Sequence, residues 1–240
     1  MKTKIYGHRG VKGEYPENTM LGFKKALELG VDGLEIDVHL TKDGELVIIH
    51  DELLERTTTG EGWVKDATLS EIKAYSVGAK FETFPKYERS WDLEKVPTLS
   101  ELLDLLKPTN VELNIELKTY KCLYPGIEEK VLELVKAYGM EDRIIYSSFH
   151  LPTMRRLQKL DPTAKVAWLL AQPISNPGDY LKEMELEALH LHEDLLTKMP
   201  ETWAGLYHKI RVWTVNDKEQ MEKLKALGVE AIITDFPNCG

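Results

Sequence analysis

Short β-branched runs alternate with stretches of helical periodicity along almost the whole chain of 240 residues. This alternation is typical of repeated βα units, which form a parallel sheet, and it predicts an α/β fold. Strand candidates cover residues 5–8, 34–38, 46–50, 111–117, 144–147, 166–170, 188–191, 212–215 and 231–234. These nine candidates are one more than an eight-stranded barrel needs, so the fold depends on whether one strand lies outside the barrel.

Clear stop signals bound the predicted helices between the strands. Three of these helices cover residues 18–29, 127–138 and 218–227, and a glycine follows each of them directly. Glycine is the residue most often found just past a helix C-terminus, because it adopts a left-handed backbone without strain. The units therefore have the form expected of regular βα repeats.

The Asp43-Gly44 turn accounts for the surplus strand. Asp-Gly between two alternating runs is a strong hairpin signal, so the third strand candidate should fold back on the second. A two-residue loop would place His50 opposite Asp37 in this hairpin. With this strand set aside, eight remain, and we predict a single (β/α)₈ TIM-barrel domain over residues 1–240.

Residues 51–95 interrupt the repeat. They carry six aromatic residues in a stretch punctuated by Pro and Gly, with one plausible helix over 70–75. A segment of this length is unusual for a loop. We predict a small inserted subdomain after the second βα region, with the aromatic side chains as its own core, and a capped helix at Thr98 to Glu101 where the barrel resumes.

The formal net charge of −9 limits the partners of the chain. Binding to a nucleic acid depends on clustered Lys and Arg, and no such cluster is present. The same charge disfavours anionic membranes, and no apolar run is long enough for a membrane span. Because residues 1–4 show no apolar signal segment, we expect a cytoplasmic protein without stable membrane association. Two distant cysteines, Cys122 and Cys239, make neither a disulfide framework nor a zinc site.

Acidic residues occur at alternate positions in two apolar strands. Glu35 and Asp37 share one face of the second strand, and Glu116 and Lys118 repeat this spacing in the strand after the insertion. Ionised carboxylates inside a barrel are costly unless they are paired or bind a metal. Carboxylate oxygens suit a hard cation such as Mg²⁺ or Ca²⁺. Ion pairs among the same residues are the alternative interpretation.

Two histidines, His8 and His50, fall at the carboxyl ends of strands, where barrel enzymes place their active sites. Two imidazoles with pKa values near 6.5 can act together at neutral pH, one as general base and one as general acid. Strict strand alternation would put Arg9 on the face opposite His8, unless Gly7 and Gly10 release the backbone there.

The charges of this cluster favour a phosphodiester. Three carboxylates, one divalent cation, Arg9 and Lys118 sum to roughly +1 with neutral histidines, which complements a substrate group of charge −1. The remaining histidines show no comparable setting, and we assign them structural or surface roles: His39, His150, His190, His192 and His208.

Several motifs, in order along nearly the whole chain, resemble those of glycerophosphodiester phosphodiesterases. They are Gly7-His8-Arg9-Gly10, Pro16-Glu17-Asn18-Thr19, the run 34–44, residues 47–51, residues 96–99, Ile115-Glu116-Leu117-Lys118, Trp213-Thr214-Val215-Asn216 and Thr234-Asp235. The resemblance implies a barrel of the phosphatidylinositol-phospholipase-C type and hydrolysis of small glycerophosphodiesters to sn-glycerol 3-phosphate and an alcohol.

The resemblance also implies a role for each matching residue. The roles are the acid/base pair for His8 and His50, metal ligands for Glu35, Asp37 and Glu116, phosphate contacts for Arg9 and Lys118, a glycerol pocket for Trp213 and Phe149, and support of the loop behind His8 for Glu17 and Asn18. The implied cofactor is a divalent ion, Mg²⁺ or Ca²⁺, with Mn²⁺ as a further candidate.

Two other functions stay open at this point. A relative of the lysophospholipase D or sphingomyelinase D kind would use the same chemistry on lipid substrates and would need an apolar mouth. A non-catalytic phosphate- or metal-binding barrel would be expected to lack part of the constellation, whereas every position of it is filled in this chain.

Overall fold

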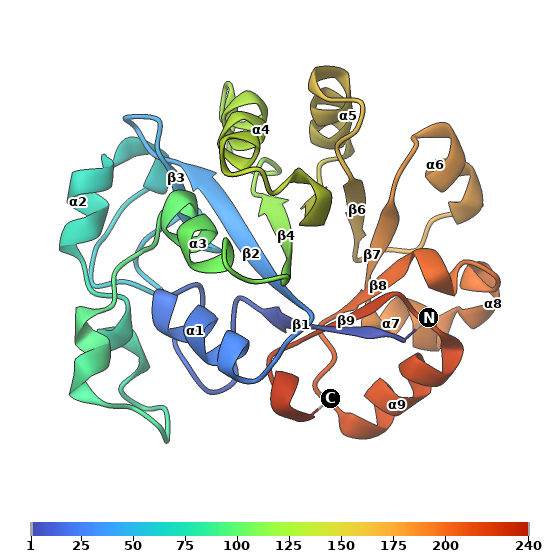
Figure 1. The fold of residues 1–240 in the computed structure, drawn as a ribbon, viewed down its shortest axis with the longest axis horizontal. Coiled ribbons are helices and arrows are strands. Elements are labelled where there is room, and N and C mark those ends of the chain that lie inside the picture. Colours follow the sequence, from blue (N-terminus) through green and yellow to red (C-terminus); the bar gives the residue numbers. More distant parts are fainter. Residues whose placement is uncertain (1, 240) are drawn as a thin grey trace.

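Nine strands form one sheet, and its first two strands also pair with each other, so that the sheet closes (Figure 1). The computed structural model describes residues 2–239. The strands are β1 (Lys4–His8), β2 (Gly33–Leu40), β3 (Leu46–Ile48), β4 (Glu112–Leu117), β5 (Ile144–Ser148), β6 (Val166–Leu170), β7 (Ala188–His192), β8 (Ile210–Trp213) and β9 (Ala231–Thr234). All except β3 are parallel and make the predicted eight-stranded barrel, so the fold prediction is confirmed.

Helices surround the barrel on its outside (Figure 1). They are α1 (Met20–Glu28), α2 (Leu69–Ala74), α3 (Leu99–Leu106), α4 (Ile127–Tyr138), α5 (Leu151–Leu160), α6 (Pro177–Glu183), α7 (Glu193–Lys198), α8 (Pro200–Trp203) and α9 (Lys218–Leu227). The predicted bounds of α4 and α9 are correct, and α1 begins after Thr19, whose side chain caps it. Within residues 2–239, no helix is long and apolar enough to cross a membrane. The cytoplasmic location stays a prediction.

The hairpin after β2 forms as predicted, but its register is shifted by one residue. Val38 lies opposite Ile48, so Asp37 faces Ile49 and not His50. The loop has three residues because Thr41 pairs with Glu45 and Gly44 adopts a left-handed backbone with φ 82°. A three-residue turn with glycine at its left-handed position is the next most common hairpin type after the two-residue turn. The predicted pairing of Asp37 with His50 is therefore wrong.

β1 and β3 pair with successive parts of the same edge of β2. β1 pairs with the first part of β2, at residues 33–35, and β3 pairs with the last part, at residues 38–40. The chain leaves β3 at Ile48, and His50 lies just past the strand end. This path brings His50 to the carboxyl ends of the barrel strands. Because His50 lies outside β3, the alternation of side chains along a strand does not determine where its side chain points.

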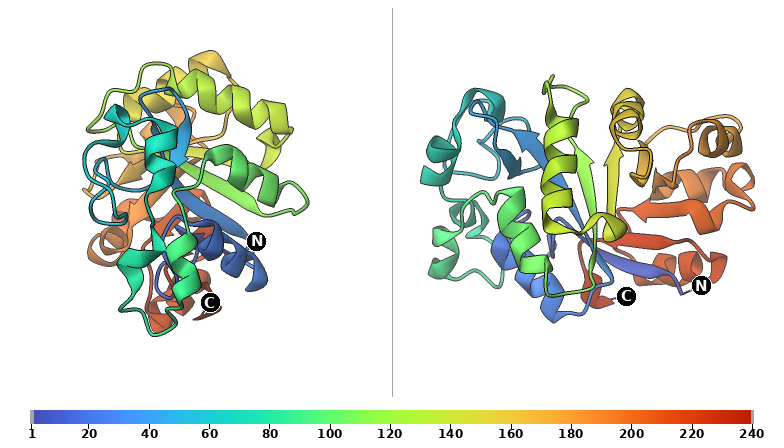
Figure 2. Two further views of the ribbon diagram at one scale, coloured as in Figure 1. Left: turned by 90° about the vertical axis from the view of Figure 1, so that its left-hand side faces the viewer. Right: turned by 45° about the horizontal axis from the view of Figure 1, so that its top comes forward.

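Residues 51–95 lie against one side of the barrel (Figure 2, left). A separate hydrophobic cluster joins this segment to the hairpin, and its buried members include Val47, Leu54, Ile72 and Trp91. α3 then starts with the predicted capping box at Thr98. Five of the six aromatic residues belong to this cluster, whereas Trp63 is 44% exposed and lies outside it, so the prediction of an aromatic core is confirmed only in part. The division into a barrel and an inserted subdomain stays a prediction.

Candidate active site

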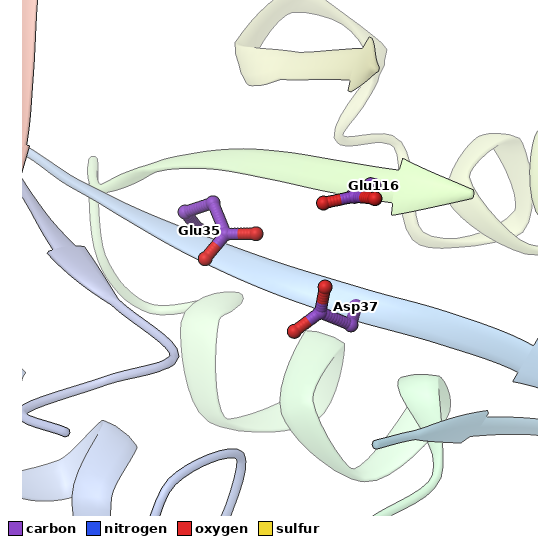
Figure 3. Close-up of side chains that lie close together, drawn as sticks. All are labelled: Glu35, Asp37 and Glu116. Carbon is purple, nitrogen blue, oxygen red and sulfur yellow. The ribbon is translucent and has the colours of Figure 1, made fainter. Parts of the chain in front are cut away.

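A cluster of three buried carboxylates lies inside the barrel. Glu35 and Asp37 project from β2 and Glu116 projects from β4, toward one another (Figure 3). Each offers an oxygen within 4.8 Å of the others. The parallel pairing of β2 with β4 places Asp37 directly beside Glu116, so strand register brings the carboxylates together.

Two cations partly balance this negative charge. Arg9 Nε lies 3.2 Å from Asp37 Oδ2, and Lys118 Nζ lies 2.9 Å from Glu116 Oε1 and 3.4 Å from Asp37 Oδ1. Burial acts to raise the pKa of Asp37, but Arg9 and Lys118 together hold it far below its usual range. Asp37 is therefore the carboxylate that keeps its charge.

The other two carboxylates are not fully compensated. Burial and the charge of Asp37 raise the pKa of Glu35 well above its usual value. Burial, opposed by Lys118 and reinforced by Asp37, raises the pKa of Glu116 to about 7. A further positive charge would thus be stabilised among these oxygens.

The donor set fits a hard divalent cation. Such ions bind carboxylate oxygens at about 2.0–2.6 Å, so ligands of one ion lie within about 5 Å of each other. Asp37 Oδ1 is buried and accepts no hydrogen bond from any group of residues 2–239, which leaves a lone pair for an ion. The three predicted ligand residues are thus brought together in a form that could hold a metal.

His8 lies at the end of β1 with its two ring nitrogens in different settings. Nδ1 is 2.6 Å from Asp235 Oδ1, and Nε2 is 3.8 Å from Glu35 Oε2. Burial lowers the pKa of His8, and the hydrogen bond to Asp235 partly opposes this effect. Because a carboxylate accepts the Nδ1 hydrogen, Nε2 is the nitrogen free for chemistry.

Arg9 reaches the same site as His8 because its own backbone is left-handed, with φ 50°. Strand alternation ends there, which answers the question that the sequence left open. Gly7 is required for this turn, since a Cβ at that position would lie 2.3 Å from the carbonyl oxygen of Gly10.

His50 has a carboxylate partner of its own. Its Nδ1 is 2.6 Å from Asp51 Oδ1, and Arg56 donates to both oxygens of Asp51. Burial lowers the pKa of His50, while Asp37 raises it and Lys118 lowers it. The site thus contains two histidines, each held at Nδ1 by a carboxylate.

Glu17 and Asn18 support the site from the loop that follows β1. Asn18 Nδ2 donates to Asp37 Oδ2 at 2.9 Å. Glu17 accepts from Arg9 at 2.9 Å and from Arg56 through both of its oxygens. Burial opposes ionisation of Glu17, but the hydrogen bonds of Arg56 and the charge of Arg9 lower its pKa. Glu17 therefore links Arg9 to the pair formed by His50 and Asp51.

Two pockets meet at His50, Glu116 and Phe149. The inner pocket, of about 200 Å³, is also lined by His8, Arg9, Lys12, Asn114 and Trp213, among others. The outer pocket, of about 510 Å³, is also lined by Leu53, Lys118, Tyr120 and Lys121, among others. Phe149 and Trp213 pack edge to face with ring centroids 5.6 Å apart, so both aromatic residues predicted for the site reach it.

Sequence reasoning missed Asp51, Arg56 and Asp235. Asp51 follows His50 directly, and Asp235 belongs to a motif already noted, so adjacency and motif membership were the available signals. Arg56 gave no such signal, because its link to Glu17 depends on the path of residues 51–56.

A closed barrel with buried carboxylates, two histidines and two cations at the carboxyl ends of its strands has the arrangement of an enzyme active site. The chain matches a model of the glycerophosphoryl diester phosphodiesterase family over residues 8–239. The chain therefore belongs to this family, as its motifs predicted.

Two bacterial enzymes are similar to this chain over nearly its whole length. A glycerophosphodiester phosphodiesterase of Caldanaerobacter subterraneus subsp. tengcongensis is 44% identical over 241 residues, covering 99% of this chain and 96% of the relative. A glycerophosphodiester phosphodiesterase of Bacillus altitudinis is 42% identical, covering 98% of this chain and 96% of the relative. These relatives support the assignment as an enzyme.

Solved structures agree with the fold. An Oleispira antarctica phosphodiesterase in complex with the product sn-glycerol-3-phosphate superimposes with a TM-score of 0.85 at 28% identity, covering 99% of this chain and 94% of that chain. A glycerophosphodiester phosphodiesterase from Agrobacterium tumefaciens gives a TM-score of 0.83 at 30% identity, covering 99% and 98%.

Proposed function

We propose that this protein hydrolyses glycerophosphodiesters, such as glycerophosphocholine and glycerophosphoethanolamine, to sn-glycerol 3-phosphate and the free alcohol. His8 and His50 act as the acid/base pair, and Glu35, Asp37 and Glu116 hold a divalent cation. The observation that carries the proposal is the pair of histidines beside one carboxylate cluster, each with its Nδ1 bound to a carboxylate. The names of the relatives and the product complex of the Oleispira enzyme support it.

The histidines suit proton transfer at neutral pH. Burial lowers the pKa of His8 and of His50, so each can be neutral and accept a proton at Nε2. Asp235 and Asp51 stabilise the imidazolium that results, as the aspartate of a catalytic triad does. One histidine removes a proton from the nucleophile, and the other gives a proton to the leaving alcohol.

The phosphate group would bind where the two pockets meet, beside Arg9 and Lys118. These cations stabilise charge on the non-bridging oxygens. A divalent ion bound by the three carboxylates would polarise a phosphoryl oxygen and offset their charge. The small inner pocket fits the glycerol arm, which every substrate of this class shares, and the larger, more open outer pocket fits the alcohol, which varies.

A product assay tests this function directly. The wild-type protein is incubated with glycerophosphocholine or glycerophosphoethanolamine in Mg²⁺, Ca²⁺, Mn²⁺ or chelator, and release of sn-glycerol 3-phosphate is measured. His8→Ala and His50→Ala should each lower turnover by about 10²–10⁴-fold while circular dichroism stays unchanged. His208→Ala is the matched control, because His208 is exposed and precedes β8 at the opposite end of the barrel. Activity that survives both active-site substitutions and the chelator would exclude the proposed mechanism.

Hydrolysis of lysophospholipids is the second candidate. It is favoured by the exposed apolar side chains in the outer pocket, where Leu53 is 40% and Tyr120 is 71% exposed. Release of choline from lysophosphatidylcholine, compared with release from glycerophosphocholine, separates the two functions. A higher kcat/KM for the lipid would favour this second candidate.

A further inference from the structure

We propose that His39 is a positioning residue that fixes His50 relative to the loop after β4, which carries Lys118. This role rests on the proposed function, because it matters only if His50 transfers protons. His39 is not among the residues that sequence motifs assigned to the site, and it was expected to be structural or exposed. It is fully buried on β2, two residues beyond Asp37 and on the same face of the strand.

The two ring nitrogens of His39 join two separate segments. Nε2 lies 3.1 Å from the carbonyl oxygen of His50, and Nδ1 lies 2.7 Å from the hydroxyl of Tyr124. Tyr124 belongs to the loop between β4 and α4 and is itself buried. The rings of His39 and Tyr124 also pack edge to face, with centroids 5.6 Å apart.

The hydrogen-bond chemistry fixes the direction of both contacts. A carbonyl oxygen only accepts, so Nε2 of His39 must carry the hydrogen that it donates to His50. In the neutral ring Nδ1 is then an acceptor, and the Tyr124 hydroxyl donates to it.

The backbone path explains why His50 needs such support. His50 lies past the end of β3, where regular strand pairing no longer holds the chain. Ile49 N donates to the Asp37 carbonyl on one edge of β2, and Lys118 N donates to the Val38 carbonyl on the other. The His39 side chain adds a bond from β2 to His50 and another to the loop beyond Lys118. It thereby connects the residue that would transfer the proton with the loop that would contact the phosphate.

The test compares two substitutions of His39 with one of Tyr124, all with glycerophosphocholine as substrate and saturating divalent cation. His39→Leu removes both hydrogen bonds and should lower kcat at least 10-fold while KM changes less than 2-fold. His39→Gln retains an amide donor where Nε2 lies and should recover at least half of the lost activity on a logarithmic scale. Tyr124→Phe removes only the donor to Nδ1 and should lower kcat by 2- to 5-fold.

Leu224→Ala is the stability control. Leu224 is a buried residue of α9, away from both loops, so this variant should lower the Tm without changing kcat. If His39→Leu does not fold, Tyr124→Phe decides the question, because an unchanged kcat in that variant would overturn the positioning role. Equal losses of kcat in the Gln and Leu variants, or an unchanged kcat in His39→Leu, would overturn the positioning role. Failure of the wild-type protein to release sn-glycerol 3-phosphate would instead reject the proposed function.

Discussion

Replacement of Asp235 by asparagine tests whether the carboxylate behind His8 contributes to catalysis. Asp235 Oδ1 is 2.6 Å from His8 Nδ1, and its Oδ2 accepts from Asn216 at 2.8 Å. Burial opposes its ionisation, but the hydrogen bond and charge of His8, followed by Lys12, lower its pKa to about 2. Asparagine has nearly the same shape without the charge, so the substitution removes electrostatic support and little packing.

The size of the effect follows from this contact. A hydrogen bond to a charged group contributes about 1.5–3 kcal/mol, and the His8 side chain is only 9% exposed, so solvent screens the interaction little. If this stabilisation is present in the transition state and absent from neutral His8, its loss lowers kcat by roughly 10- to 150-fold. The pKa of His8 should also fall further, because Asp235 is the group that most opposes the effect of burial.

The assay is release of sn-glycerol 3-phosphate from glycerophosphocholine between pH 4 and 9, with Tm measured in parallel. The limb of the kcat/KM profile that reports His8 should move to lower pH in Asp235→Asn. Asp66→Asn, an exposed substitution with a 62% exposed side chain, serves as the matched control. A kcat within 2-fold of the wild-type value, with Tm unchanged, would refute this role of Asp235.

Three further predictions concern stability and the metal. Burial lowers the pKa of His39 to about 4, against about 6.5 in the unfolded chain, so the unfolded chain binds a proton first as pH falls. His39 alone should therefore lower the free energy of unfolding by about 3 kcal/mol between pH 7 and pH 4, and His39→Gln should reduce the pH dependence measured in urea titrations. Since the pKa of Glu116 is raised to about 7, binding of a divalent cation should release protons, and calorimetry should show tighter binding at pH 8 than at pH 6. Glu116→Gln should weaken binding of the cation at both pH values. Binding that does not depend on pH would contradict this prediction. Ile72→Ala, in the hydrophobic cluster that joins residues 51–95 to the hairpin, should cost about 2–5 kcal/mol in urea unfolding, and a loss below 1 kcal/mol would show that this cluster packs loosely.

The carboxylate cluster could be predicted from sequence because strand geometry determines it. Glu35 and Asp37 alternate on one strand, and any parallel neighbour with an acidic residue at the same level brings a third carboxylate beside them. Glu116 meets this condition. The argument needs only the period of a strand and the parallel order of βα units, and both are readable from the residue pattern.

The partners of the histidines could not be found in this way. Asp235 is 227 residues from His8 in sequence, and the two meet only because β1 pairs with β9 when the barrel closes. The predicted pairing of His50 was wrong for a different reason, because the position of His50 depends on the number of residues in one turn. Thr41 bonds to Asp43 and Glu45 in that turn, and this local choice moves the register by one.

The observed neighbours change the charge argument that pointed to a phosphodiester. The sequence count of roughly +1 included only the three carboxylates, one divalent ion, Arg9 and Lys118. The structure adds further charged groups to the same network: Glu17, Asp51, Asp235, Lys12 and Arg56. Six carboxylates then face four cations, and a divalent ion brings the network to neutrality.

A bound diester adds one negative charge to this neutral network. Uptake of one proton by one of the two histidines restores neutrality, and this is the state with one imidazole and one imidazolium that acid/base hydrolysis requires. The substrate would thus raise the pKa of a histidine that burial lowers in its absence. Because Asp235→Asn removes one of the six carboxylates, it should also weaken proton uptake on substrate binding. Calorimetry with a non-hydrolysable phosphodiester analogue in buffers of different ionisation enthalpy would measure that loss directly.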